Sequence, residues 1–195
     1  MSTVKYYDWS YHQARTRPNK VAVKEVSTGR ETTYGQLEER SCRLASWLQN
    51  KGVKKGDRVA ILIHNCTEVF ELEFACAKIG AIELPLNWRL TKPELEYILN
   101  DSSPEVLIYG SNFADTAKAL TTDCSIKNSL EIDDEDQNNE YEQALKENID
   151  FDVIETTHDD LIMLMYTSGT TGHPKGAMIT HEMQFYNIVN LAGSA

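Results

Sequence analysis

Residues 161–180 read LIMLMYTSGTTGHPKGAMIT, and this stretch decides how the chain is organised. It opens with six apolar residues ending at Tyr166, a run that predicts a buried strand, and it closes with AMIT, which predicts a second short strand. Between the two lie three glycines, four hydroxyl side chains and one lysine, Lys175. A plain hairpin connection needs only about two to five residues, so the longer loop here predicts a ligand-binding turn between two strands.

The chemistry of this loop is suited to phosphate. Glycines let the backbone come close to an anion, successive N–H groups converge on it, and the hydroxyls donate hydrogen bonds. The order differs from a P-loop, in which a glycine directly precedes the lysine; here Lys175 lies between Pro174 and Gly176. The candidate phosphate-binding residues are Thr167, Ser168, Gly169, Thr170, Thr171, Gly172 and Lys175. The alternative, a Gly/Ser/Thr surface turn closed by proline, is disfavoured by the length of the loop.

Upstream of this loop, strands and helices are expected to alternate. A hairpin is predicted within 21–34, and an amphipathic helix follows over 34–51 with Gly52 after its end. The later strands are expected at 59–63, 82–86 and 106–109. The later helices are expected between an N-cap at Asn65 or Thr67 and a stop at Gly80, at 92–100 behind a capping box of Thr91 and Glu94, and at 113–120. This alternation predicts an α/β fold made of parallel βαβ units.

The net charge of −11 is concentrated in one segment. Residues 131–160 hold 13 of the 30 acidic side chains and one of the 19 basic ones. We interpret this segment as a solvated, partly mobile connection; an interaction tail is the alternative. A basic stripe is lacking, so the sequence does not support a nucleic-acid partner.

Cysteine usage and the first residues point to a cytoplasmic protein. Cys42, Cys66, Cys76 and Cys124 show neither CxxC metal spacing nor a disulfide framework, which favours reduced thiols. The amino-terminal residues lack the apolar stretch of a signal peptide, and the sequence has no apolar run of about 18 residues that would span a bilayer.

Four more polar residues are candidates for a ligand site. His64 and Asn65 follow a predicted strand, where open α/β sheets place ligand crevices, although a polar strand end or helix cap is the better interpretation. Arg89 is able to pair with a phosphate or carboxylate, and a structural ion pair is the preferred interpretation. His181, at the start of the helix expected after the second strand, is interpreted as structural.

TSGTTGHPKG resembles the signature of the adenylate-forming superfamily, which contains acyl- and aryl-CoA synthetases, luciferases and the adenylation domains of peptide synthetases. Upstream segments agree with that family in order and spacing: TTYGQL (32–37), GDRVAIL (56–62), KIGAIELPLNWRL (78–90) and ELEYILNDSSPEVLI (94–108). The PLNWRL form is closer to acyl- and aryl-CoA synthetases than to peptide-synthetase modules.

The resemblance implies a fold and a division of the chain. Residues 1–195 are expected to form the amino-terminal part of the AMP-binding domain, with a βαβ region at 1–130, an acidic connection at 131–160 and the signature loop with a helix start at 161–195. A second, related sheet is expected to contain the two signature strands. The carboxy-terminal domain is expected to be absent, so that this polypeptide alone is inactive.

The resemblance also implies a reaction. A carboxylic acid, foremost a fatty acid, attacks ATP to give an acyl-adenylate and pyrophosphate, and the thiol of coenzyme A then displaces AMP. Mg²⁺ is the implied metal, although the sequence offers no ligand for it, and Lys175 is the candidate catalytic residue. One alternative is an aryl-CoA ligase, and another is a nucleotide-binding module without ligase activity. The sequence leaves the oligomeric state open.

Overall fold

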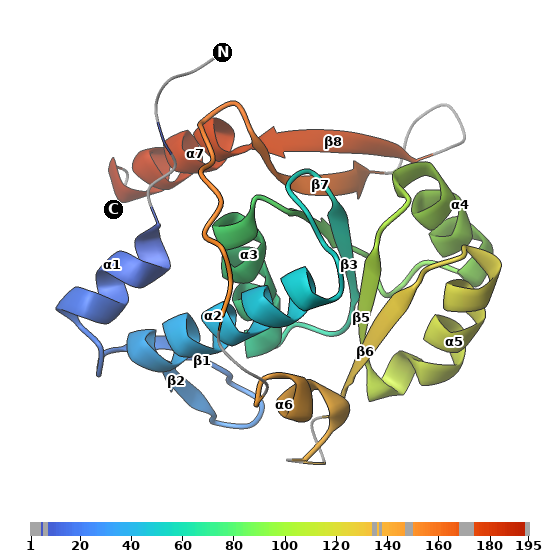
Figure 1. Cartoon of the computed structure of the whole chain (residues 1–195), viewed down its shortest axis with the longest axis horizontal. Helices are drawn as coiled ribbons and strands as arrows, with labels where there is room; N and C mark the ends of the chain where they lie inside the picture. The colour runs from blue at the N-terminus through green and yellow to red at the C-terminus, as the bar shows by residue number, and fades with distance from the viewer. Residues whose placement is uncertain are drawn as a thin grey trace.

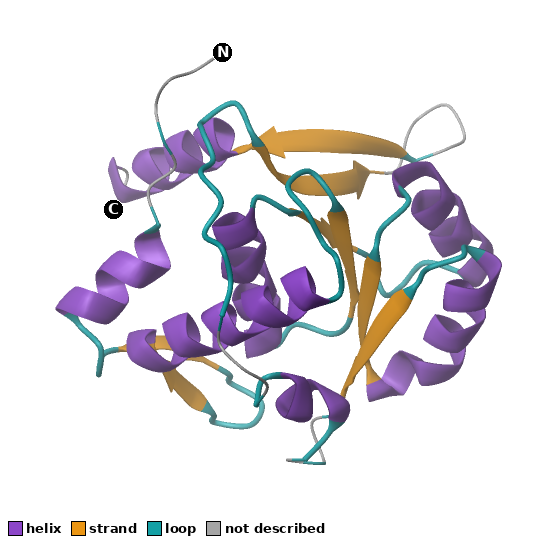
Figure 2. Ribbon diagram, viewed as in Figure 1, coloured by secondary structure: helices purple, strands orange, loops and turns teal. Residues whose placement is uncertain are grey.

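The structure is a computed structural model that describes residues 5, 8–133, 136, 138–146, 150–167 and 174–193. Its centre is a six-stranded sheet with helices on both faces (Figures 1 and 2). The strands are β1 (Val21–Lys24), β2 (Glu31–Thr33), β3 (Arg58–Leu62), β4 (Ile82–Pro85), β5 (Val106–Gly110), β6 (Asn128–Ile132), β7 (Leu161–Thr167) and β8 (Lys175–Thr180). The helices are α1 (Trp9–Thr16), α2 (Tyr34–Asn50), α3 (Thr67–Ile79), α4 (Lys92–Ser102), α5 (Ala114–Asp123), α6 (Glu140–Ala144) and α7 (His181–Gly193), with a 3₁₀ turn at Ser111–Phe113.

The predicted α/β fold is confirmed. Strands follow the order β6-β5-β3-β4-β7-β8, and all neighbours are parallel except β7 and β8. Alternate residues of β3 enter opposite cores: Val59 and Ile61 pack with α2 and α3, whereas Ala60 and Leu62 pack with α4 and α5. A strand buried on both faces has to be apolar at every position, which explains the uninterrupted VAIL sequence.

Local sequence signals set several helix ends, and those at Thr91 and Gly80 are as predicted. Capping boxes begin α2, at Thr33 and Gln36, and α4, at Thr91 and Glu94. Gly80 ends α3 in the left-handed conformation, with φ of 68°. These caps use residues within one turn of the helix end, so a single sequence is enough to locate them.

The amino-terminal end of α3 differs from the prediction. Its N-cap is Cys66, and Thr67 is the first helical residue. The backbone N–H and hydroxyl of Thr67 both donate to a carboxylate oxygen of Glu25, just beyond β1, at 2.9 and 2.8 Å. Burial favours protonation of Glu25, but the hydrogen bonds from Arg30 and Thr67 outweigh it and lower the pKa to about 2. A carboxylate from the neighbouring hairpin therefore stabilises this helix end, a contact with no local sequence signal.

The expected second sheet is wrong for the described chain. β7 lies parallel to β4 in the same sheet, with Glu83 opposite Met163, and β8 pairs antiparallel with β7 at the edge. The expectation of a buried β7 is also wrong in part, because Ile162 is buried while Met165 is 41% exposed. An apolar run does not distinguish a strand covered on both faces from one covered on a single face.

The interpretation of 131–160 as a solvated connection is wrong for its helix. Residues 131 and 132 complete β6, and α6 buries Tyr141, Ala144 and the following Leu145. These three positions are spaced i, i+3 and i+4, the pattern of one helical face, which the surrounding charges conceal in the sequence.

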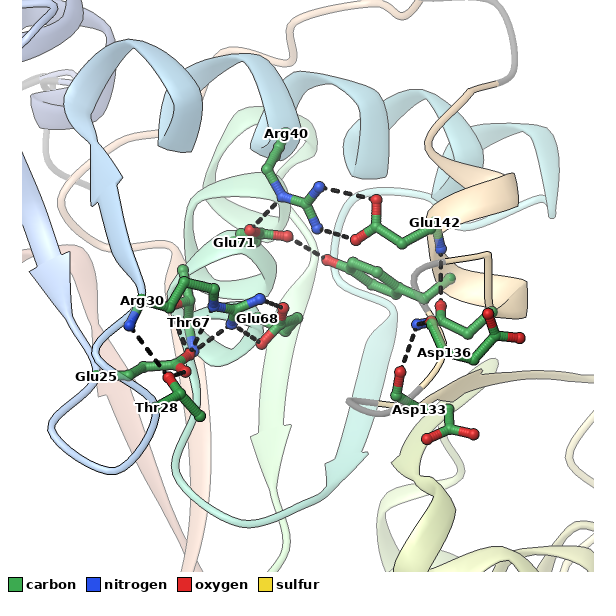
Figure 3. A network of polar contacts seen from close by, with 12 residues as sticks. Glu25, Thr28, Arg30, Arg40, Thr67, Glu68, Glu71, Asp133, Asp136 and Glu142 are labelled. Atoms are coloured by element: carbon green, nitrogen blue, oxygen red, sulfur yellow. Dashed lines mark hydrogen bonds and ion pairs between the residues drawn. The ribbon is translucent and has the colours of Figure 1, made fainter.

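A network of polar contacts attaches this acidic segment to helices α2 and α3 (Figure 3). The guanidinium of Arg40 on α2 donates to Glu71 on α3 and, through two N–H groups, to Glu142 on α6. The hydroxyl of Tyr141 donates to the second oxygen of Glu71 at 2.7 Å. A second arginine, Arg30, donates to Glu25 and Glu68 in the same view. Bidentate arginine pairs of this kind fix the orientation of the elements that they join.

Candidate functional site

The β7–β8 hairpin carries the predicted phosphate loop at its open end. β7 ends at Thr167, β8 begins at Lys175, and these two residues lie directly opposite one another. Both are exposed. Directly opposed residues of an antiparallel pair project from the same face of the sheet, so a hydroxyl and an ammonium group stand side by side at the mouth of the loop.

The structure thus brings together two of the seven candidate residues. The other five, Ser168, Gly169, Thr170, Thr171 and Gly172, lie outside the described residues. The predicted arrangement of strand, loop and strand is confirmed by the pairing on either side of the loop. A hydroxyl donor beside a lysine is a donor set that fits an anionic oxygen.

A cleft of about 380 Å³ lies next to this hairpin. It opens at the carboxyl ends of β3, β4 and β7, where open parallel sheets bind their ligands. Its lining comes from the strand ends, the segment after β4 and the end of β7, and includes Ile63, Asn65, Pro85, Asn87, Trp88, Arg89, Met165 and Tyr166. The cleft is therefore lined by the two residues that immediately precede Thr167.

Aromatic rings fix one wall of this region. The exposed His64 ring lies edge-on to Trp88, with centroids 4.6 Å apart, and edge-on to Phe113 at 5.0 Å. The guanidinium carbon of Arg89 lies 4.1 Å from the centre of the Trp88 ring. The expected ion pair of Arg89 is replaced, in the part of the chain that the structure describes, by this cation–π contact. His64 and Asn65 occupy the strand end at which the sequence places them.

His181 has the structural position that its sequence context predicts. Its side chain is 2% exposed, and its backbone N–H donates to the carbonyl of Asp160 at 3.0 Å. Burial lowers the pKa of His181 to about 4, so its imidazole is neutral at pH 7. It does not line the cleft beside the hairpin.

The thiols are free, as predicted, and are poor nucleophiles. Burial raises the pKa of Cys42 to about 12 and also raises that of Cys66, so neither side chain is a thiolate at neutral pH. The described residues contain no group of three or more His, Cys, Asp or Glu side chains that would hold a metal ion.

One side chain near the hairpin mouth has no sequence signal at all. Asp101, on the last turn of α4, accepts a hydrogen bond from the hydroxyl of Tyr166 at 2.5 Å. The two residues are 65 positions apart. Only the fold brings them together.

Among the helices built from described residues, none combines the length and apolar character needed to cross a bilayer.

Known proteins resemble this chain along most of its length. A feruloyl-CoA synthase of Amycolatopsis sp is 40% identical over 183 residues, which are 94% of this chain and 35% of that protein. The long-chain-fatty-acid–CoA ligase FadD13 of Mycobacterium tuberculosis is 37% identical over 180 residues, 92% of this chain and 36% of that protein.

The fold is similar to solved structures as well. A fatty acyl CoA synthetase of Mycobacterium tuberculosis superposes with a TM-score of 0.77 at 34% identity, covering 89% of this chain and 34% of the other. This chain thus spans about a third of the length of these relatives. A family model described as AMP-binding enzyme matches residues 10–194. On the strength of that match and of the hairpin that carries the signature loop, the chain belongs to the AMP-binding enzyme family.

Proposed function

We propose that this chain supplies the phosphate-binding part of an enzyme that activates a carboxylic acid with ATP and transfers the acyl group to coenzyme A. The observation that carries the proposal is the pairing of Thr167 with Lys175 at the mouth of the signature loop, beside the strand-end cleft. Membership of the AMP-binding enzyme family supports it.

The reaction consists of two displacements. A carboxylate oxygen attacks the α-phosphorus of ATP, the bond from that phosphorus to the bridging oxygen breaks, and pyrophosphate leaves. The sulfur of coenzyme A then attacks the carbonyl carbon of the acyl-adenylate, AMP leaves, and the thiol proton passes to solvent. Negative charge grows on the departing pyrophosphate in the first step, so fixed donors at that position lower the barrier.

Each proposed site residue has a role in that first step. Lys175 is the proposed catalytic residue, because its ammonium offsets the charge on the β- and γ-phosphates. The hydroxyls of Thr167, Ser168, Thr170 and Thr171 bind phosphate oxygens, and Gly169 and Gly172 allow close backbone approach. Mg²⁺, when bound, would supply further positive charge beside the phosphates.

A fatty acid is the first proposed substrate, in line with the fatty-acid–CoA ligase among the relatives. An aromatic acid is the second candidate, because a feruloyl-CoA synthase is 40% identical to this chain. We place the protein in the cytoplasm, since free thiols suit a reducing compartment and ATP and coenzyme A would be available there. We propose that the chain divides into a βαβ region at about 1–130, an acidic segment at 131–160 and the signature loop with the following helix at 161–195, with β6 running across the first boundary to Ile132.

The function is tested by exchange of labelled pyrophosphate into ATP, using the product of the complete reading frame that contains this chain. Exchange is expected only when a suitable acid is present, because it requires reversible adenylation. Fatty and aromatic acids are compared in one panel, and addition of coenzyme A should yield the thioester. Release of ADP and phosphate at a rate independent of any acid would contradict the proposal and favour another nucleotide-dependent activity.

The role of Lys175 is tested by Lys175→Ala in the same protein. Loss of one well-placed electrostatic donor costs on the order of 3 kcal/mol in the transition state, so kcat is expected to fall about 100-fold with a smaller change in KM for ATP. Lys118→Ala, an exposed lysine on α5, is the control and should leave both constants unchanged. A fully active Lys175→Ala enzyme would remove the assigned role.

A further inference from the structure

The ring of Tyr166 occupies the mouth of the hairpin that carries the signature loop. Tyr166 is half-buried, immediately precedes Thr167, and lies opposite Gly176 in the antiparallel register. Its hydroxyl donates to a carboxylate oxygen of Asp101 at 2.5 Å. The Tyr166–Gly176 pair, next to the Thr167–Lys175 pair at the loop, is thus attached to α4.

Gly176 allows the ring to take this position. A Cβ atom placed on Gly176 would lie 3.3 Å from Cζ of Tyr166 and 2.9 Å from a methyl carbon of Leu164. Both distances are shorter than ordinary van der Waals contact, so any side chain at this position would displace the ring or the leucine. The glycine next to Lys175 therefore has a packing role in this hairpin.

Asp101 belongs to α4, a helix that is held in place at several points. Leu95, Ile98 and Leu99 anchor α4 in the core. Arg58, at the start of β3, donates to the backbone carbonyls of Ser102 and Ser103 at 2.6 Å each, which holds the end of α4 against the central sheet. The contact from Asp101 to Tyr166 thus connects the hairpin mouth to a helix that is packed into the core and bonded to β3.

The hydrogen bond between Tyr166 and Asp101 is charge-assisted. Burial and the neighbouring Asp101 carboxylate raise the pKa of the Tyr166 phenol well above its usual range, so the hydroxyl stays protonated as the donor. Bonds of this kind are shorter and stronger than those between neutral groups.

We propose that Tyr166 and Asp101 are positioning residues that hold the mouth of the signature loop, so that Thr167 and Lys175 present their side chains to phosphate in one arrangement. The inference rests on the proposed function for its catalytic consequence. Neither residue has to touch the nucleotide: Tyr166 acts through the adjoining Thr167 and through the strand pair that sets the position of Lys175.

A positioning role predicts a specific kinetic change. Removing the bond leaves Lys175 and its charge in place but lets the mouth adopt several arrangements, and misplacement of a catalytic group by about 1 Å can cost up to roughly 100-fold in rate. For Tyr166→Phe we expect kcat for adenylation to fall about 10-fold, with KM for ATP changing less than about 3-fold. Asp101→Ala should behave in the same way.

The variants come with matched controls. Asp101→Asn keeps an oxygen that accepts the hydrogen bond and should restore most of the rate lost in Asp101→Ala. Tyr186→Phe removes a hydroxyl from an exposed tyrosine on α7 and should leave kcat unchanged. Since phenylalanine and asparagine preserve shape, thermal unfolding of Tyr166→Phe, Asp101→Asn and Tyr186→Phe should stay close to wild type.

A second readout is independent of activity. Amide hydrogen exchange is measured on the 195-residue chain. In Tyr166→Phe it should become at least about 10-fold faster at residues 166, 167, 175 and 176, because the mouth loses its support. Exchange at Ile179, farther along β8, should not accelerate. Unchanged exchange at the mouth, or an unchanged kcat in Tyr166→Phe, would overturn the proposal. If the wild-type protein shows no acid-dependent pyrophosphate exchange, the proposed function fails, and the hydrogen exchange data alone then decide whether the mouth is held by this bond.

Discussion

Removal of the Arg40 side chain is predicted to cost far more stability than removal of its neighbour on the same helix. Nε of Arg40 lies 2.5 Å from a carboxylate oxygen of Glu71, and two further N–H groups donate to Glu142 at 2.6 and 3.0 Å. Glu71 is 1% exposed. The variant Arg40→Met therefore leaves a carboxylate in the core with the Tyr141 hydroxyl as its donor and without its counter-ion.

The size of the effect follows from burial. Removing one partner of a buried ion pair costs about 3–5 kcal/mol, and the 25% exposure of the Arg40 side chain places the expected loss near the lower value, about 3 kcal/mol. Arg43→Met is the matched control: its partner Glu39 is 60% exposed, and a surface pair contributes at most about 1 kcal/mol. The two variants should differ by about 2 kcal/mol in the free energy of unfolding at pH 7.

The loss should also depend on pH. Burial raises the pKa of Glu71 and Arg40 opposes that rise, so the pKa is higher still in Arg40→Met. The folded variant then retains a proton above pH 4.5, the ordinary value for this carboxyl, where the unfolded chain has released it. Stability of the variant is full below that pH and falls as pH rises through the folded pKa, so the deficit relative to wild type is smaller in acid.

Urea denaturation of wild type, Arg40→Met, Arg43→Met and the double variant Arg40→Met/Glu71→Leu tests this reasoning at pH 7 and near pH 4.5. The double variant should recover at least half of the loss, because it removes the isolated buried carboxylate. The argument fails if Arg40→Met is no more destabilising than Arg43→Met at pH 7, or if its deficit is the same at both pH values.

Three further predictions concern single positions and the chain as a whole. Glu83 is fully buried with neither carboxylate oxygen hydrogen-bonded in the described structure, and burial together with nearby Glu73 raises its pKa to about 8. Its stabilising contribution is full below pH 4.5 and falls as pH rises through about 8, so Glu83→Gln should be more stable than wild type at pH 9. Chemical denaturation measures this difference, and a less stable variant would contradict the prediction. Gly80→Ala should lower the unfolding temperature more than Gly29→Ala. Both glycines have positive φ, but only at Gly80 would a Cβ lie 2.9 Å from Cγ of Lys55. Equal decreases would show that this contact relaxes freely. The 195-residue chain alone is expected to form no acyl-adenylate in a mass-spectrometric assay with ATP and an acid, since it spans about a third of its relatives, and detectable product would contradict that expectation.

The sequence by itself determined most of the local elements and located the candidate phosphate loop. The capping box at Thr91, the glycine that ends α3 and the apolar runs of β3 and β5 predict their elements within a few residues. All of these signals lie within one turn or one strand, so the interactions behind them are encoded in neighbouring residues. The loop between β7 and β8 is identified in the same way, from its own glycines, hydroxyls and lysine.

Only the tertiary structure decided which distant residues meet. The parallel pairing of β4 with β7 put the signature hairpin into the main sheet, the Glu71–Tyr141 bond joined residues 70 positions apart, and the Asp101–Tyr166 bond joined residues 65 positions apart. No periodicity connects such partners, because their contact depends on how whole helices and strands pack and on which edge of the sheet remains to be paired. The sequence therefore supplies the candidate chemistry of the loop. The position of the hairpin that carries it, with Tyr166 lining the strand-end cleft and bonded to Asp101 of α4, is a property of the folded chain.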